Sequence, residues 1–222
     1  MEHPEPPKLL TFDYRALRLL VGIIAVSIPV IVTLIAKLEL PSISASYYTN
    51  ARDAFVGLLF VVAAFLWAYN GHTNWQKYTS KLAAIAAIGV AVFPTSCDAD
   101  IFEKVCDIYG ESSTGTLHYV SASILFVVLA IFCFVFFRND IKHQEGKKKR
   151  RSQIYLTCGV VMVIAMAVML STLFIDYQQS FGWTSVVFVA EAAALIAFGS
   201  AWIVAGKAIP WLVNDNEKLT LF

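Results

Sequence analysis

The sequence has few charged residues. Asp, Glu, Lys and Arg make up 15% of its 222 residues, whereas an ordinary soluble domain has about 25%. This shortage excludes an ordinary soluble domain, and the high apolar content excludes a disordered chain. The net charge of +1 offers no attraction for nucleic acid, so we expect no nucleic-acid partner. Instead the chain has 58% hydrophobic residues and a mean hydropathy of +0.66, so a large apolar surface has to face lipid.

Histidine and hydrolase motifs are also scarce. The chain has four His, with no H-x-x-x-H pair and no G-x-S-x-G nucleophile elbow. Two axial His for a haem are not available inside the apolar segments, and we expect no cofactor. Because a catalytic zinc needs about three protein ligands, a metal site would have to combine His118 with carboxylates such as Asp53 and Asp176.

Six apolar blocks have lengths near the ~20 residues that cross a bilayer as a helix. They cover residues 17–36, 53–70, 81–95, 117–137, 154–175 and 184–206. We therefore predict an all-α, polytopic bundle of six transmembrane helices. The membrane domain is 17–206, between terminal segments 1–16 and 207–222. In the last helix, Ala at every fourth position from 193 to 205 predicts a packing face.

The distribution of Lys and Arg predicts the orientation. With six spans, 14 of these residues fall on one side and 3 on the other. Positive charge in short loops stays cytoplasmic, so we predict that both termini are cytoplasmic. A basic run on that side either serves only as a topology determinant or contacts anionic lipid headgroups. The run consists of Lys147, Lys148, Lys149, Arg150 and Arg151.

Two cysteines fall together in the third loop, on the predicted extracytoplasmic side. Cys97 and Cys106 could form a disulfide there, because such compartments permit oxidation, or they could remain two free thiols. Zinc binding is less favoured, since C-x8-C matches no usual zinc spacing.

Polar residues gather in the outer half of the predicted bundle. Glu191 lies within the last apolar block, and an intramembrane carboxylate indicates a functional site unless it is protonated or hydrogen-bonded structurally. Six other polar residues fall on the same predicted extracytoplasmic side, and together with Glu191 they indicate an outward-facing polar cavity. Each of them alone also has an ordinary explanation, such as a helix N-terminus or an interfacial aromatic belt. They are Arg52, Asp53, His118, Ser44, Tyr48 and Asp176.

Several short motifs follow one another in a familiar order. They are P-x-I-S at 41–44, F-x-G-L at 55–58, Phe-Pro at 93–94, L-H-x-x-S-A at 117–122 and the acidic Glu191. In this order the chain resembles the six-span Frag/DRAM/Sfk superfamily and uncharacterised bacterial relatives. The resemblance implies a lipid-linked role in a membrane. For the location we favour a bacterial inner membrane, with an endomembrane or lysosomal membrane as the alternative.

Together these features predict an integral membrane protein that binds or organises a lipid or a membrane partner without catalysis. The partners would be membrane lipids, another membrane protein or a second copy of the chain. Two alternatives stay open. The serine-rich outer segment with Asp53 and His118 resembles the CREST metal-dependent lipid hydrolases, and Glu191 could serve a small transporter or channel.

Overall fold

The computed structural model describes residues 14–97, 102, 106, 114–139, 141, 145–172, 174–175 and 185–214. This part of the chain is helical and has no strand, which confirms the predicted all-α class. The helices are α1 (Tyr14–Ala36), α2 (Arg52–Ala68), α3 (Asn74–Val92), α5 (Gly115–Ile131), α6 (Phe137–Asn139), α7 (Lys147–Ser171) and α8 (Val186–Ala205). The shorter elements are the 3-10 helices η1 (Ser44–Tyr48) and η3 (Pro210–Leu212) and the π-helix η2 (Phe132–Phe136).

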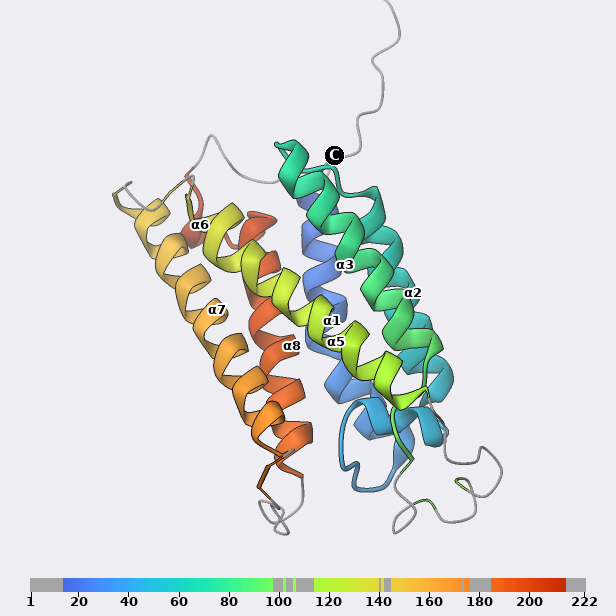
Figure 1. Ribbon diagram of the computed structural model, residues 1–222. Coiled ribbons are helices and arrows are strands. Elements are labelled where there is room, and N and C mark those ends of the chain that lie inside the picture. The colour runs from blue at the N-terminus through green and yellow to red at the C-terminus, as the bar shows by residue number, and fades with distance from the viewer. Residues whose placement is uncertain are drawn as a thin grey trace, which may run out of the picture.

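The long helices run side by side and alternate in direction (Figure 1). Each packs against the next along the chain, and α8 packs against α1 as well as α7, so the order of neighbours closes into a ring. We call the end of the bundle that holds segment 41–51, Cys97 and Cys106 the disulfide end. The opposite end, with residues 71–73 and 147–151, is the basic end.

Within the part of the chain that the structure describes, four helical segments are long and apolar enough to cross a membrane. They are Arg15–Ala36, Gly115–Asn139, Lys147–Ser171 and Val186–Ala205. The chain is therefore a multi-pass membrane protein. α2 has 17 residues and α3 has 19 with two lysines, and neither is among these four. The predicted number of six spans stays a prediction.

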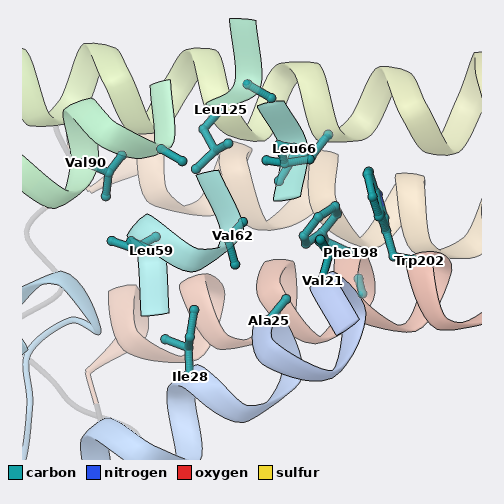
Figure 2. Close-up of a cluster of buried hydrophobic side chains, with 14 of the residues drawn as sticks. Val21, Ala25, Ile28, Leu59, Val62, Leu66, Val90, Leu125, Phe198 and Trp202 are labelled. Atoms are coloured by element: carbon teal, nitrogen blue, oxygen red, sulfur yellow. The ribbon is translucent and has the colours of Figure 1, made fainter. Parts of the chain in front are cut away.

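The core runs along the inside of the bundle (Figure 2). It brings together apolar side chains of α1, α2, α3, α5 and α8. On the outside, Leu34 is 69% exposed and Ile164 57% exposed, as expected of helices that face lipid. The labelled core residues are Val21, Ala25, Ile28, Leu59, Val62, Leu66, Val90, Leu125, Phe198 and Trp202.

α1 and α8 touch backbone to backbone at two glycines. A Cβ atom on Gly22 would lie 2.6 Å from the carbonyl oxygen of Gly199, and a Cβ on Gly199 would lie 2.6 Å from that of Gly22. Only residues without a side chain allow this approach. Three of the four alanines in the predicted packing row, Ala197, Ala201 and Ala205, are buried nearby.

Two helices begin seven residues before their apolar blocks, which corrects the predicted boundaries. α3 begins at Asn74 rather than at 81, and α7 begins at Lys147 rather than at 154. For α3 the reason is local, because the Thr73 hydroxyl accepts a hydrogen bond from the Gln76 N–H at 3.2 Å and caps the helix. Hydropathy detects the apolar part of a helix and misses polar turns that continue it beyond the membrane.

The π-helix η2 collects aromatic rings in the half of the bundle near the basic end. Phe132 and Phe137 are five residues apart, the repeat of π-helical hydrogen bonds, and both are buried. Their ring centroids lie 5.5 and 5.6 Å from that of Trp202 in α8. The predicted continuous helix over 117–137 is thus interrupted where these rings turn inward.

Candidate functional site

Glu191 lies in the second turn of α8 and faces the segment that joins α1 to α2. Its Oε2 accepts hydrogen bonds from the backbone N–H groups of Ile43 and Ser44, with N···O distances of 2.5 and 3.4 Å. Its Oε1 accepts a third from the Ser44 hydroxyl at 3.1 Å. Since Ile43 and Ser44 lie at the N-terminal end of η1, the carboxylate caps that short helix from another part of the chain.

Ser185 makes a second attachment between the same two segments. Its hydroxyl oxygen accepts a hydrogen bond from the Phe188 N–H at 3.1 Å and so caps α8. The same hydroxyl donates to the carbonyl oxygen of Pro41. Segment 41–48 is therefore held against the start of α8 at two points.

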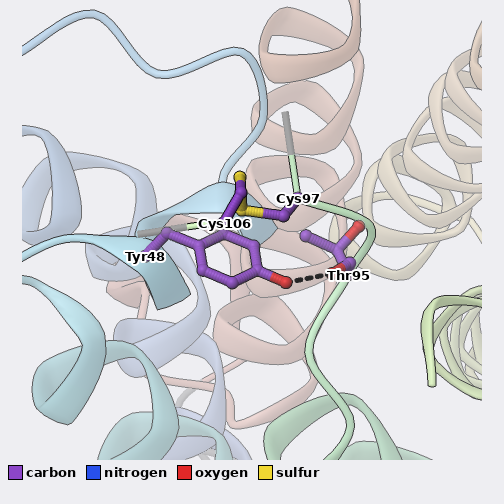
Figure 3. Close-up of a disulfide and its surroundings, with 4 residues drawn as sticks. All are labelled: Tyr48, Thr95, Cys97 and Cys106. Atoms are coloured by element: carbon purple, nitrogen blue, oxygen red, sulfur yellow. Dashed lines mark hydrogen bonds between the residues drawn. A yellow bond between two sulfur atoms is a disulfide. The ribbon is translucent and has the colours of Figure 1, made fainter. Parts of the chain in front are cut away.

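Tyr48 connects this segment to the disulfide (Figure 3). Its hydroxyl donates to the carbonyl oxygen of Thr95, and its ring centroid lies 5.9 Å from that of Phe102. Cys97 and Cys106 are bonded to each other, with their Cα atoms 5.7 Å apart. The two cysteines singled out in the sequence thus form a covalent link beside Tyr48.

Arg52 and Asp53 begin α2 and line a groove between α2 and α3 with a volume of about 400 Å³. The Arg52 guanidinium donates to the Tyr47 hydroxyl at 2.8 Å and lies 4.3 Å from the centroid of that ring. The Asp53 side chain is exposed. Beyond these polar residues the groove is apolar, and its walls are formed by Val56, Gly57, Phe60, Ala91 and Val92.

His118 is buried between α5 and the end of α3, with 2% of its surface exposed. Its Nδ1 lies 2.7 Å from the carbonyl oxygen of Phe93, the C-cap residue that follows α3. This hydrogen bond satisfies a carbonyl that the helix itself leaves free.

One family model matches residues 23–208, and its description is "Protein of unknown function (DUF998)". The chain belongs to this DUF998 family. No curated protein and no solved structure matches it. Membership agrees with the expectation of uncharacterised relatives, whereas the comparisons lend no support to the resemblance to Frag/DRAM/Sfk.

In this DUF998 protein the predicted site residues lie in three separate places at the disulfide end. Glu191 and Ser44 attach the 41–48 segment, Arg52 and Asp53 line the α2–α3 groove, and His118 bonds to the end of α3. Tyr48 lies between the first of these places and the disulfide. Asp176 lies outside the described residues.

The residues considered for a metal are not brought together where the structure describes them. Within the described residues, no group of three or more His, Cys, Asp and Glu side chains could hold a metal ion. Asp53 is exposed at the start of α2, while the His118 ring is directed to a backbone carbonyl.

The basic run forms the first turns of α7 rather than a loop. Lys149 and Arg150 are exposed, whereas Arg151 is buried, with 3% of its surface exposed. Lys147 Nζ donates to the carbonyl oxygen of Val213 at 2.8 Å and holds the segment after α8 against α7. The five cations therefore have different surroundings, although they follow one another in the sequence.

Arg18 is an internal cation that is not among the predicted site residues. It lies in the second turn of α1, is 9% exposed, and donates to the Tyr69 hydroxyl at 2.5 Å and the Ala205 carbonyl oxygen at 3.2 Å. The available signal was its position inside the predicted span 17–36, since a charge within a membrane segment indicates function by default.

Proposed function

We propose that this DUF998 protein binds a membrane lipid, without catalysis, in the groove between α2 and α3 at the disulfide end. The observation that carries the proposal is the order of residues along the groove. Charged Arg52 and Asp53 lie at its outer end, and apolar Val56 and Phe60 follow one and two turns further into α2. A lipid has the same order, from a polar headgroup to an acyl chain.

The headgroup end offers one cation and one carboxylate close together in sequence. The Arg52 guanidinium at this end of the groove suits a phosphate, because Arg binds phosphate oxygens through paired N–H groups. The exposed Asp53 can accept from an amine or a hydroxyl. This pair suits a headgroup that carries a phosphate together with a cationic or hydroxyl group.

The acyl end is open because of Gly57. A Cβ added at this position would have no atom within 4 Å, and Phe60 and Val92 on either side are 43% and 49% exposed. Such large exposed apolar surface is stable only in contact with lipid or a partner. A chain lying over Gly57 would cover it.

The groove is at headgroup depth only if α2 and α3 also cross the membrane, which we include in the proposal. Their 17 and 19 residues correspond to roughly 26 and 28 Å at 1.5 Å per residue, close to the ~30 Å hydrocarbon core. They run beside the four apolar spans from one end of the bundle to the other (Figure 1). We propose six spans, with the basic end and both termini cytoplasmic, in a bacterial inner membrane.

Filling the groove tests the proposal. We expect Gly57→Leu to reduce the lipid that remains on the protein in native mass spectrometry, because the new side chain occupies the space of an acyl chain. Ala64→Leu is the matched control, since Ala64 is also exposed on α2 and lies outside the groove. Arg52→Gln should weaken retention of phosphate-containing lipid in particular.

Equal lipid retention by wild type, Gly57→Leu and Arg52→Gln would refute lipid binding in this groove. The orientation has a separate test, since a fluorescent or phosphatase fusion after residue 214 reports the side of the C-terminus. If the fused phosphatase shows that the C-terminus lies outside the cytoplasm, the proposed orientation is contradicted, and the groove measurement is unaffected.

A further inference from the structure

A second groove lies on the other side of α3, between α3 and α5. α3 packs against both α2 and α5, so it separates this groove from the one between α2 and α3 (Figure 1). The second groove has a volume of about 310 Å³ and is lined mainly by large apolar side chains. Among the described lining residues, the Ser121 hydroxyl is the only polar side-chain group. The lining therefore suits a hydrocarbon chain.

Small residues at the contact between the two helices produce this groove. A Cβ atom on Gly89 of α3 would collide with the Ser121 hydroxyl of α5, so the helices approach closely at this point. Ala86, one turn earlier on α3, is 5% exposed, whereas its neighbour Ile85 is 58% exposed. The small residues leave a depression beside the longer side chains, which include Ile124 on the α5 wall.

The two grooves meet at the end of α3 that is nearest the disulfide. Val92, in the last turn of α3, lines both of them. From Val92 the second groove follows α3 back to Leu82, a rise of about 15 Å at 1.5 Å per residue. This is half of the ~30 Å hydrocarbon core, the depth of one leaflet. The first groove follows α2 inward from Arg52 to Phe60, a rise of about 12 Å.

We propose that the second groove binds the second acyl chain of the lipid in the groove between α2 and α3, so that the ligand is a two-chain phospholipid. This inference rests on the proposed function, because the headgroup stays at Arg52 and Asp53. One chain lies over Gly57, and the other crosses Val92 and follows α3 toward Ile85.

The meeting point of the grooves supports two chains rather than one. The two chains of a phospholipid diverge from a single headgroup, and the two grooves diverge from Val92 on either side of α3. A lipid with one chain would leave the exposed side chains of the second groove, such as Ile85 and Ile124, without a specific contact.

Two lipids with the same headgroup test the number of chains. The full chain in neutral detergent is titrated with phosphatidylglycerol or with its one-chain form, lysophosphatidylglycerol, and the complexes are measured by native mass spectrometry. Each titration is repeated with Ile124→Trp, whose larger side chain fills the second groove. Ile131→Trp is the matched control, because Ile131 lies two turns further along α5, is similarly exposed and is outside the groove.

We expect the wild type to bind the two-chain lipid about tenfold more tightly than the one-chain lipid, because the second chain buries apolar surface in the groove. Ile124→Trp should lower the affinity for the two-chain lipid to about that for the one-chain lipid, and should leave the one-chain lipid within about twofold of wild type. Ile131→Trp should leave both affinities within about twofold. If Ile124→Trp does not fold, Ile88→Trp fills the groove from the α3 wall and replaces it.

Equal affinity of the wild type for the two lipids would overturn the second-chain site, and so would a preference that Ile124→Trp leaves unchanged. In either case, binding of the one-chain lipid that Gly57→Leu weakens would still support the groove between α2 and α3. Binding of neither lipid would overturn both proposals. A preference that Ile124→Trp abolishes, with no effect of Gly57→Leu on either lipid, would support the second groove and refute the first.

Discussion

Replacing Glu191 tests whether its carboxylate holds the 41–48 segment in place. Glu191→Ala removes the acceptor of three hydrogen bonds, two of which, from Ile43 N and Ser44 Oγ, are 2.5 and 3.1 Å long. A hydrogen bond to a charged group contributes about 1.5–3 kcal/mol. The two shorter bonds together therefore give a loss of roughly 3–6 kcal/mol in the free energy of unfolding, and the third, at 3.4 Å, adds little.

Glu191→Gln keeps the length of the side chain and one carbonyl oxygen, so the expected loss is about 1–2 kcal/mol. For a chain of this size the Ala variant should lower the unfolding temperature in detergent by roughly 6–24 °C, which tryptophan fluorescence can follow. Ser44→Ala in both backgrounds gives a double-mutant cycle with a coupling of about 1–2 kcal/mol. Glu145→Ala, at an exposed site of the basic end, is the control.

An Ala variant as stable as wild type, or a coupling near zero, would refute the reasoning. Glu191 would then be tolerated in the membrane rather than used to attach the segment. A variant that melts normally but fails to carry ions in liposomes would instead favour the transporter alternative.

Three further substitutions should each change the free energy of unfolding in a stated direction. Gly22→Ala should lower the free energy of unfolding by about 1–3 kcal/mol in chemical denaturation, because its Cβ would meet the Gly199 carbonyl at 2.6 Å; unchanged stability would contradict the close helix contact. Gly57→Ala, on an open helix face, should raise the free energy of unfolding by about 0.5–1 kcal/mol, since Ala is the better helix former; a loss would mean that protein side chains fill the groove at this position and would contradict the open face. Cys97→Ser opens a loop with a sequence separation of 9 and should lower the free energy of unfolding by about 2–3 kcal/mol by the chain-entropy relation. Prior reduction of the wild type should have the same effect, and an unchanged free energy of unfolding would refute the prediction.

The sequence predicted the helices well where membrane burial alone determines them. Each apolar block lies on one of the long helices, because about 20 apolar residues satisfy their backbone only as a helix in lipid. The extensions at Asn74 and Lys147 were missed, since caps and polar turns do not raise hydropathy. The π-helical interruption at 132–136 leaves no mark in composition.

The site was predicted only in part because side-chain partners depend on the packing of distant segments. Glu191 stands out in the sequence as a carboxylate within an apolar block, but its contact with Ile43 and Ser44 spans almost 150 residues of chain. Arg151 looked like its neighbours in the run, and only the packing of α7 against α8 and its other neighbours separates it from Arg150. Position in a charge run does not reveal which members turn inward.

The contact between α1 and α8 also determines when, during synthesis of the chain, the bundle can be completed. Gly22 and its partner Gly199 are 177 positions apart, so the first helix enters the membrane long before the surface that covers it is made. Until α8 is synthesised, η1 lacks the Glu191 carboxylate that caps it, and the face of α1 at Gly22 is open to lipid or to a chaperone. The ring can close only as the last step of biogenesis, and a chain stalled before α8 would be a natural substrate for quality control.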